Sequence, residues 1–251
     1  MKVSVITVVK DHASGLKTTY ESLIGQSFED WEMVIVVGNS RDETMDTALK
    51  YPIFDPRIKV LVQRGTGIYD AMNQGLQSAT GEFTWFMNAG DRFATSSTLV
   101  HALEKAIQDK AGLIIGGYEI DNGADNQIFS FPEGNVTTLD FAFTRRGGCH
   151  QAMIFRTAAI REVGGFDTAY SLASDFDLVL KVMKTWSVKR VSEVYASIEP
   201  GGRADQGISL VHKQKHQIRR DLLGGPFIFT ASLLWTSLAR LKISLRRALK
   251  G

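Results

Sequence analysis

One acidic residue lies where a buried strand would reach the surface. The apolar segment FTWFM, residues 83–87, is followed directly by NAGD, residues 88–91. Gly90 allows another group to approach the main chain closely beside Asp91. A single carboxylate there suits Mg²⁺ or Mn²⁺, because these ions take one or two protein carboxylates and complete their shells with water and phosphate. The alternative is a turn in which Asp91 caps a helix beginning near Ser96.

Two further acids open a predicted helix. Asp175 and Asp177 stand in the segment SDFDLVL, directly after Ser174, a residue type suited to the N-cap position. One of these carboxylates could act as a general base that takes a proton from a hydroxyl group. Helix starts commonly carry acids because the positive end of the helix dipole favours negative charge, so a purely structural role stays open.

Several well-known functional motifs are missing from the sequence. The first apolar run, residues 3–9, is not followed by G-x-G-x-x-G, which disfavours a dinucleotide-dependent dehydrogenase. The absence of G-x-x-x-x-G-K-[ST] and of G-x-S-x-G argues against a P-loop NTPase and an α/β-hydrolase. No Cys/His cluster has structural-zinc spacing. His212 and His216 stand four residues apart without a third ligand, so we interpret them as a solvated helix face.

Length and composition are those of a globular protein. The chain has 251 residues, 44% of them hydrophobic, and a formal charge of +2, which is too small to indicate a nucleic-acid partner. The single cysteine, Cys149, excludes an internal disulfide and suits a reducing compartment. The start MKVSVITVVK lacks the long apolar region of a signal peptide, so we expect a core strand there and a cytoplasmic protein.

Strand-like and helix-like segments alternate through the first part of the chain. The expected strands are residues 3–9, 32–37, 57–63, 82–87 and 112–118, and the expected helices are residues 15–26, 41–51, 68–79 and 96–108. This alternation predicts an α/β fold whose mainly parallel sheet is covered by helices on both faces. Ligands of such sheets bind beyond the carboxyl ends of the strands, which selects residues 7–11, 37–42, 65–70 and 88–91.

The alternation breaks after about Gly117. The turn-rich residues 121–134 indicate an insertion or hairpin, and further strands and helices follow, so we expect mixed strands added to the parallel half. The predicted strands are residues 150–156 and 188–199, and the predicted helices are residues 157–164 and 174–186.

The tail, residues 222–251, has no acidic residue and differs from the domain formed by residues 1–221. Its apolar side chains recur at helical spacing, with the basic ones mostly on the opposite side, which predicts a helix on an anionic membrane surface or against a partner. The apolar stripe is Phe227, Ala231, Leu234, Leu238, Leu241, Leu245 and Leu249, and the basic residues are Arg240, Arg246, Arg247 and Lys250. A membrane span is not expected, because residues 224–226 (Gly-Gly-Pro) interrupt the apolar run. Packing on its own domain or on a dimer partner is the alternative.

Taken in order, these segments resemble the family 2 glycosyltransferases, which have the GT-A fold. SVITVVKD resembles the family's first strand, and ESLIGQSFEDWEMVIVVGNSRDET resembles its S-L-x-x-Q and D-G-x-S-x-D-x-T blocks. GIYDAMNQGLQSATGEFTWFMNAGD is similar to its G-I-Y-D-A-M-N-K-G block and the strand after it. CHQAMIFR, GGFD and ASDFDLVLKV resemble its acceptor-side blocks. The resemblance covers residues 2 to about 205 and is closest to bacterial exopolysaccharide and colanic-acid-type transferases.

The resemblance implies a role for individual residues. Asp91 falls at the D-x-D position and would hold the divalent cation, while Asp175 falls at the base position with Asp177 beside it. His150 and Gln151 would lie near the sugar or the acceptor, although His150 could equally be structural. The implied nucleotide-sugar site comprises Thr7, Val9, Asp11, Asn39, Asp70, Asn73, Asn88, Ala89, Gly90 and Arg203.

The sequence departs from the family pattern at three places. Val37 and Gly65 stand where the family carries acids on the nucleotide side, so the nucleobase stays open. The family's G-G-x-S ends in Arg203 and Ala204, without the serine unless Ser209 replaces it. Arg203 could contact a diphosphate in its place.

The resemblance implies an inverting glycosyltransferase dependent on Mn²⁺ or Mg²⁺. The donor would be a UDP-, GDP- or dTDP-sugar, and the acceptor a polyprenyl-diphosphate-linked saccharide in cell-surface polysaccharide synthesis. The tail would hold the enzyme on the inner face of the cytoplasmic membrane. A non-catalytic nucleotide-sugar-binding or scaffold subunit is one alternative, and Val37 and Gly65 favour it. A nucleotidyltransferase is another, but the first loop lacks the Gly- and Arg/Lys-rich sequence that it would need.

Overall fold

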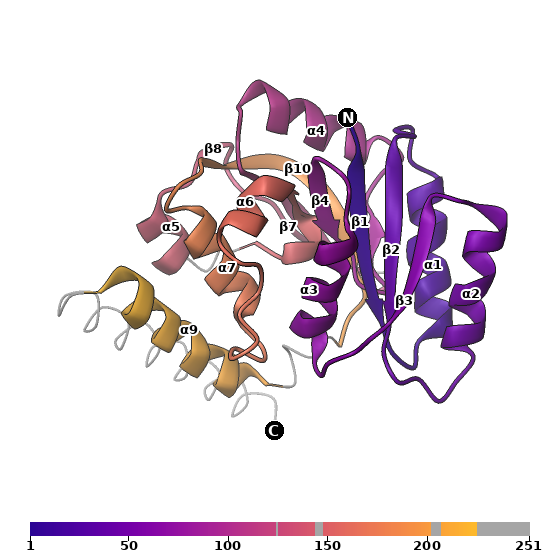
Figure 1. The fold of residues 1–251 in the computed structure, drawn as a ribbon. Coiled ribbons are helices and arrows are strands. Elements are labelled where there is room, and N and C mark those ends of the chain that lie inside the picture. Colours follow the sequence, from indigo (N-terminus) through magenta and orange to yellow (C-terminus); the bar gives the residue numbers. More distant parts are fainter. Residues whose placement is uncertain (124, 144–147, 202–206, 225–251) are drawn as a thin grey trace.

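One mixed sheet of ten strands runs through the whole molecule. The computed structural model describes residues 1–123, 125–143, 148–201 and 207–224. The strand order is β3-β2-β1-β4-β9-β6-β10-β5, with β7 paired to β6 and β8 to β10 (Figure 1). The strands are β1 (Val3–Val9), β2 (Trp31–Val37), β3 (Ile58–Val62), β4 (Phe83–Phe86), β5 (Arg92–Phe93), β6 (Leu113–Ile120), β7 (Gln127–Phe129), β8 (Gly134–Asn135), β9 (Met153–Arg156) and β10 (Val188–Ile198).

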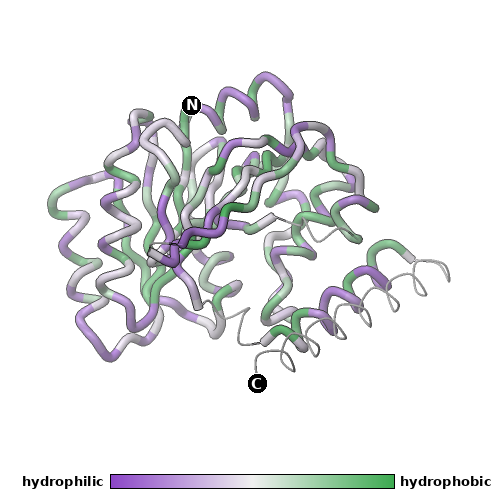
Figure 2. The backbone as a smooth tube through the Cα atoms, turned by 180° about the vertical axis from the view of Figure 1, so that it is seen from behind, coloured by the Kyte–Doolittle hydropathy of each residue, from purple (hydrophilic) through white to green (hydrophobic). Residues whose placement is uncertain are grey.

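The helices cover both faces of this sheet, as predicted. They are α1 (Ala13–Ile24), α2 (Thr44–Phe54), α3 (Ile68–Ser78), α4 (Thr98–Gln108), α5 (Thr138–Phe143), the 3-10 helix η1 (His150–Ala152), α6 (Thr157–Glu162), α7 (Ser174–Val182) and α9 (Ile208–Leu223). Residues of α1 and α4 share one apolar core with one face of the strands, and residues of α3, α5, α6, α7 and α9 share the core on the other. Along the outer helices hydrophobic and hydrophilic residues alternate (Figure 2).

The first half of the sheet is parallel, and its strands are mainly apolar. β1 lies between β2 and β4, with Val3 opposite both Trp31 and Phe83. Every residue of β1 and β2 is buried, as expected of strands covered by helices on both faces. Helix α3 lies close to this sheet because Gly75 has no side chain: a Cβ there would be 2.4 Å from Ile6 Cγ2.

The second half is mixed, which confirms the expected change after Gly117. β9 is antiparallel to both of its neighbours, β4 and β6, whereas β6 and β10 are parallel. Residues 121–134 include β7, which pairs with the end of β6 as a hairpin. Because β9 runs in the opposite direction, its first residues and η1 before it lie at the carboxyl end of β4, with Met153 opposite Ile115 of β6. This reversal brings His150 and Gln151 to the edge of the sheet that carries Asp91.

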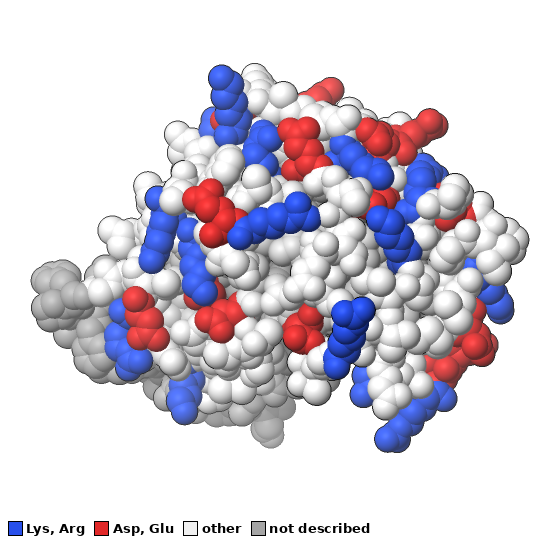
Figure 3. Space-filling view, in the orientation of Figure 1, with Lys and Arg blue, Asp and Glu red and all other residues white. Residues whose placement is uncertain are grey.

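The C-terminal region begins with a helix that the sequence indicated only through His212 and His216. Helix α9 continues to Leu223, so the expected boundary between residues 221 and 222 falls within its last turn. The stripe of residues 227–249 and Arg203 lie outside the described residues. None of the helices in the described ranges combines the length and the hydropathy that crossing a bilayer requires. On the face shown in Figure 3, acidic and basic side chains are interspersed, in keeping with the small net charge.

Candidate active site

Four segments that are distant in sequence meet at the carboxyl edge of the sheet. They are the loop after β4, the helix η1, the first turn of α7 and the residue after β10. Three contacts join them: Asn88 to His150, His150 to Asp175, and Asp91 to the main chain of Glu199. The predicted metal ligand and the predicted base thus lie at one site.

The loop after β4 gives Asp91 a fixed position. Gly90 has φ +100°, and its N–H donates to the carbonyl of Gly15 in α1 (3.0 Å). The Thr19 hydroxyl of α1 donates to the main-chain oxygen of Asp91 (2.6 Å). A Cβ at position 90 would be only 2.1 Å from Glu199 Oε2. Glycine is therefore required here both for its backbone angle and for the space that the Glu199 carboxylate occupies.

Asp91 is a buried carboxylate with neutral hydrogen-bond donors. Its side chain is 5% exposed; Gln151 Nε2 donates to Oδ2 (2.8 Å) and the Glu199 N–H donates to Oδ1 (3.0 Å). Burial raises the pKa of Asp91 to about 6, and these two hydrogen bonds offset only part of that rise. The carboxylate bonds these groups and not the start of α4, whose N-cap is Ser97. The alternative in which Asp91 caps that helix is therefore wrong.

Asp175 has a different electrostatic environment. Its Oδ1 accepts from the Phe176 N–H (2.8 Å) and from the Tyr69 hydroxyl (3.4 Å), and its Oδ2 lies 3.7 Å from His150 Nδ1. Burial alone would raise the pKa of Asp175, but the hydrogen bond from His150 and the charge of Lys215 hold it below its usual value. The side chain is still 30% exposed. An ionised and accessible carboxylate can accept a proton.

His150 joins Asp175 to the loop that carries Asp91. Its Nε2 lies 3.2 Å from Asn88 Nδ2, and its Nδ1 faces Asp175. If the Asn88 amide donates, Nε2 is the acceptor and the ring proton sits on Nδ1, directed at Asp175. Within the described ranges the buried Asn88 Oδ1 has no hydrogen-bond partner, so one acceptor in the site is left for a ligand.

Two residues with predicted supporting roles, Asp177 beside the base and Gln151 near the sugar or the acceptor, have mainly positioning contacts. Asp177 is 2% exposed and pairs with Lys181 one turn later (2.7 Å), a contact that fixes α7 and does not join the Asp175 network. Gln151 holds Asp91 through its amide nitrogen, and its Oε1 accepts from the Cys149 thiol (2.6 Å). Burial raises the pKa of that thiol, so it stays protonated.

On the nucleotide side, the loops after β1 and β2 are tied together. Asp11 has φ +51°; its Oδ1 accepts from the Arg41 N–H (2.6 Å), and its own N–H donates to Ser40 Oγ (3.1 Å). Asn39 in the second loop is exposed. Thr7 and Val9 are buried in β1, and Ala89 lies next to it through an N–H bond to Val8 (3.3 Å). The predicted segments after β1, β2 and β4 are therefore adjacent.

The start of α3 explains one departure from the family pattern. A Cβ at Gly65 would lie 1.8 Å from Asp70 Oδ2, so the Asp70 carboxylate fills the space beside Gly65. An acid is thus present next to the position where the family's acid is missing. Val37 is fully buried in the core and has no such replacement nearby in its strand. The side-chain amide of Asn73 donates through Nδ2 to the Phe166 carbonyl (2.8 Å) and accepts at Oδ1 from the Phe166 N–H (2.9 Å), which joins α3 to the segment before α7.

The sequence reading missed several residues of this site. Glu199 follows β10, so the carboxyl-end rule that selected Asp91 could have found it; its Oε2 lies 3.6 Å from His12 Nε2. Tyr69 stands within GIYDAMN, but nothing in that motif indicates a contact with a residue 106 positions away. Lys215 lies on α9, for which no motif was available.

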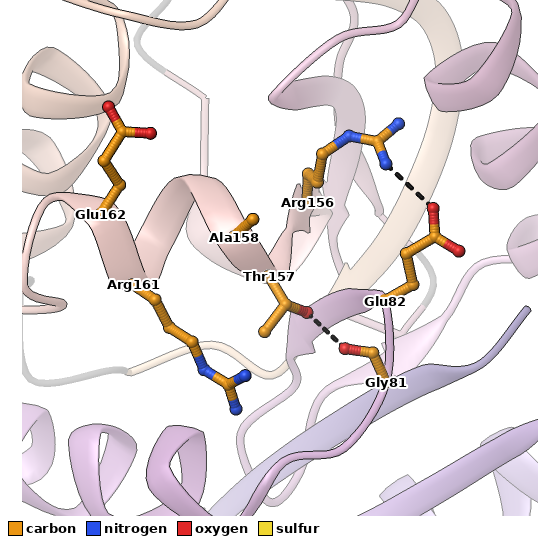
Figure 4. Close-up of a pocket in the computed structure, with 7 residues that line it drawn as sticks. All are labelled: Gly81, Glu82, Arg156, Thr157, Ala158, Arg161 and Glu162. Carbon is orange, nitrogen blue, oxygen red and sulfur yellow. Dashed lines mark hydrogen bonds and ion pairs between the residues drawn. The ribbon is translucent and has the colours of Figure 1, made fainter.

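A cavity of about 620 Å³ lies at the opposite end of the sheet (Figure 4). It is lined by Gly81, Glu82, Arg156, Thr157, Ala158, Arg161 and Glu162. Its polar groups bond one another or the nearby main chain: Arg156 pairs with Glu82 (2.9 Å), and Thr157 Oγ1 donates to the carbonyl of Gly81 (2.8 Å). Because its polar side chains are already paired, this cavity offers less to a nucleotide than the carboxyl edge does.

The side chains around Asp91 could hold a divalent cation only if a bound ligand completes the coordination shell of the ion. Within the described ranges no three His, Cys, Asp or Glu side chains are grouped closely enough to hold a metal ion by themselves. Asp91 is a buried carboxylate without a cationic side chain hydrogen-bonded to it, and such a group gains from a bound cation. Mg²⁺ and Mn²⁺ commonly bind one or two carboxylates together with substrate phosphates. The residues therefore fit a metal that arrives with a phosphorylated ligand.

Comparison with known proteins shows which family the sequence matches. The model of the family described as "Glycosyl transferase family 2" matches residues 4–164. A PGL/p-HBAD biosynthesis glycosyltransferase of Mycobacterium bovis is 29% identical over 186 residues, covering 71% of this chain and 68% of that protein. An uncharacterized glycosyltransferase of Mycobacterium tuberculosis is 27% identical over 189 residues, with the same coverage of both chains.

Solved structures show the same fold. Residues 1–349 of TarS from S. aureus superpose with a TM-score of 0.73 at 20% identity, covering 93% of this chain and 71% of that one. The mannosyltransferase PcManGT from Pyrobaculum calidifontis, in complex with GDP-Man and Mn²⁺, gives 0.65 at 16% identity and covers 98% and 79%. These likenesses confirm the predicted GT-A fold.

Proposed function

We propose that this chain, which belongs to the glycosyl transferase family 2, moves a sugar from a nucleotide-sugar donor to a hydroxyl group of a saccharide acceptor. The family predicted from the motifs is confirmed, while the closeness to exopolysaccharide and colanic-acid-type transferases stays a prediction. One observation carries the proposal: two carboxylates in opposite electrostatic environments, Asp91 and Asp175, lie at one edge of the sheet, and His150 joins Asp175 to Asn88 in the loop that carries Asp91.

Asp91 would bind the divalent cation together with the diphosphate of the donor. Its raised pKa and neutral donors leave the carboxylate in need of positive charge, and Glu199 is the nearest other acid. The Mn²⁺ and GDP-Man bound by PcManGT support this pairing of metal and donor. When bound, the metal would supply positive charge that stabilises the departing nucleoside diphosphate. Gln151 and the Glu199 N–H would keep Asp91 oriented toward it.

Asp175 would be the general base of an inverting reaction. It would take the proton of the acceptor hydroxyl, whose oxygen then attacks the anomeric carbon from the face opposite the nucleotide. Its lowered pKa keeps the carboxylate ionised at neutral pH, so it is ready to accept that proton. The Tyr69 hydroxyl and His150 Nδ1 restrain its two oxygens. Asp177 supports α7 through Lys181.

The donor would be a UDP-, GDP- or dTDP-sugar. TarS is described in complex with UDP and with UDP-GlcNAc, and PcManGT with GDP-Man, so neighbours of one fold use different bases. Val37 removes a base-contacting acid from this chain, whereas Asp70 places a carboxylate beside Gly65. The adjacent loops that carry Asp11 and Asn39 would border the nucleotide, and Arg203 would contact the diphosphate.

The acceptor would be a saccharide on a polyprenyl diphosphate at the inner face of the cytoplasmic membrane, used in cell-surface polysaccharide synthesis. The basic, apolar-striped residues 226–251 support this, because such segments bind anionic lipid surfaces. Deletion of residues 226–251 leaves α9 intact and should release the protein from anionic vesicles without weakening nucleotide binding. Unchanged vesicle binding by the truncated protein would rule the membrane role out.

The proposal is tested by measuring binding and transfer separately. Purified protein is titrated with UDP-, GDP- and dTDP-sugars in Mn²⁺ or in EDTA, alongside Asp91→Asn and Asp175→Asn. We expect one nucleotide to bind in a metal-dependent way, Asp91→Asn to lose that binding, and Asp175→Asn to bind normally while its turnover falls about 10²- to 10⁴-fold. Full turnover in Asp175→Asn would contradict the assignment of the base.

A non-catalytic subunit is the second candidate. The missing acids at Val37 and Gly65 favour it, because both lie on the nucleotide side. As a scaffold, such a subunit predicts that none of the nucleotides binds under any condition. The Asp70 carboxylate beside Gly65 and the ionised Asp175 favour the enzyme instead.

A further inference from the structure

Helix α9 lies beyond the residues matched by the family model, yet it packs against the segment that leads to Asp175. Gln214 is 8% exposed and makes two bonds: its Oε1 accepts from the Leu172 N–H (3.0 Å), and its Nε2 donates to Ser171 Oγ (3.2 Å). These residues precede the first turn of α7. Gln214 thus fixes the main chain three positions before the carboxylate.

The next residue of α9 brings a positive charge to the same place. Lys215 Nζ lies 5.0 Å from the ring centroid of Phe176, which directly follows Asp175, and it interacts electrostatically with the Asp175 carboxylate. Within the described ranges its ammonium group has no hydrogen-bond or ion-pair partner. Arg219, one turn later, stacks on the same ring (5.2 Å) and donates to the carbonyl of Ala142 (2.7 Å). Lys215 is therefore held by packing and acts as a point charge.

Other contacts hold the beginning of this segment, whereas among the described residues the side-chain hydrogen bonds from other elements to its end come from α9. Asn73 bonds Phe166, and Lys181 lies 3.5 Å from Asp167. From there to Ala173 the side-chain bonds to other elements come from α9: Gln214 to Ser171 and Leu172, and Asp221 to the Tyr170 hydroxyl at a long 3.5 Å. The placement of Asp175 depends on α9 for that reason.

We propose that α9 is a positioning element for the base, in which Gln214 fixes the main chain at Ser171 and Leu172 and Lys215 keeps a positive charge beside Asp175. The inference rests on the proposed function, because it assumes that Asp175 removes the acceptor proton. Neither residue touches the reacting atoms. They act through the place and the charge of the Asp175 carboxylate.

The charge effect has a defined direction. The groups that face Asp175 are His150 from η1, Tyr69 from α3, Lys215 from α9 and the Cys149 thiol. The thiol and the phenol are neutral, so Lys215 brings the positive charge from α9; burial lowers the pKa of Lys215, and the Asp175 carboxylate offsets part of that shift. Removing that charge raises the pKa of Asp175, and the base is then protonated over a wider range of acidic pH.

The test uses the full chain and matched variants of one helix. Gln214→Ala is paired with Gln217→Ala, and Lys215→Met with Lys213→Met, because Gln217 and Lys213 are exposed on the same helix. For each we measure kcat and the donor KM from acidic to alkaline pH. Thermal unfolding and metal-dependent nucleotide binding check the fold.

The expected changes separate position from charge. Gln214→Ala should lower kcat about 10- to 100-fold with an unchanged donor KM, since a small misplacement of a catalytic group has a large effect on rate. Lys215→Met should move the acidic limb of the kcat profile upward by about one pH unit, and Lys215→Arg should restore it. Both controls should behave as the wild-type protein.

Two failures are distinguishable. If Gln214→Ala and Lys215→Met match their controls while Asp175→Asn is inactive, the role of α9 is wrong and the proposed function stands. If Asp175→Asn keeps full turnover, the proposed function itself fails. If Gln214→Ala unfolds, Gln214→Glu replaces it, because Glu keeps the acceptor for the Leu172 N–H and removes the donor to Ser171. An unchanged pH profile of kcat in Lys215→Met overturns the charge effect independently.

Discussion

Glu32, near the amino ends of the parallel strands, and Asp91, at their carboxyl ends, are carboxylates buried to a similar extent. Glu32 is 2% exposed and Asp91 is 5% exposed. Their pKa values nevertheless move in opposite directions, to about 2 for Glu32 and to about 6 for Asp91. Burial alone would raise both, so the difference lies in the groups around them.

Glu32 has a complete set of donors. It accepts from the hydroxyl of Ser4 (2.7 Å), the hydroxyl of Thr80 (2.8 Å) and the ammonium group of Lys59 (3.1 Å). These bonds lower the pKa of Glu32 by more than burial raises it. Asp91 has one amide and one main-chain N–H, both neutral. The amino end of the sheet satisfies its buried charge from within the protein, whereas the carboxyl end leaves a charge that a ligand can complete.

The largest expected effect comes from replacing Asp91 at the carboxyl end, which should reduce activity without reducing the stability of the fold. Asp91→Asn should lower transfer about 10²- to 10³-fold, because the charge that we propose binds the metal is lost. Its free energy of unfolding should change by less than about 1 kcal/mol, since removing a poorly paired buried charge offsets the lost hydrogen bond. Steady-state rates and thermal melting measure the two. A large loss of stability would show that Asp91 is a structural carboxylate like Glu32.

A substitution of Glu32 at the amino end should have the converse effect, on stability and not on activity. Glu32→Gln should lower the free energy of unfolding by about 2–3 kcal/mol at neutral pH, because it removes the charge that three groups solvate. The turnover of the remaining folded protein should not change, since the site is at the other end of the strands. Denaturant unfolding with activity assays tests this. An unaltered unfolding midpoint would contradict the contrast between the two ends.

The pH dependence of stability sharpens the same contrast. The folded pKa of Glu32 is depressed from 4.5 to about 2, so its contribution is present above pH 4.5 and is lost as pH falls toward 2. The wild-type protein should lose stability over that interval more steeply than Glu32→Gln does. Denaturant titrations at a series of acidic pH values compare the two slopes. Parallel curves would mean that the hydrogen bonds of Glu32 do not hold in solution.

The smallest effect concerns the cavity at the amino end. Glu82 is half exposed and pairs with Arg156 at the cavity rim. Glu82→Gln should change stability by less than about 1 kcal/mol, because exposed ion pairs contribute little, and it should leave nucleotide binding unaltered. Calorimetric titration with the nucleotide checks this. Weaker nucleotide binding would instead place a ligand in the cavity.

The parallel half of the sheet was predictable because its strands are continuous apolar runs. The predicted residues 3–9 coincide with β1, and the carboxyl-end rule selected Asp91 directly from the end of its strand. The direction of β9 was not predictable, since an apolar run has the same appearance in either orientation. That reversal decides where His150 and Gln151 lie.

The hydrogen-bond partners of the site residues could not be predicted from the sequence for a related reason. Local periodicity carries no information about contacts between residues far apart in the chain, such as Tyr69 with Asp175. Asn73 is a second example: the family resemblance places it at the nucleotide, but the nitrogen and the oxygen of its side-chain amide both bond the main chain of Phe166. The role of α9 depended on packing, for which no pattern was available.

The two donors to Asp91 also bear on how the chain matures during synthesis. They come from residues 60 and 108 positions later in the chain. A nascent polypeptide that has emerged only through β4 can pair β1 with β2 and β4, but it has neither donor for the carboxylate. The hydrogen bonds to the Asp91 carboxylate therefore form late, after β10 has left the ribosome.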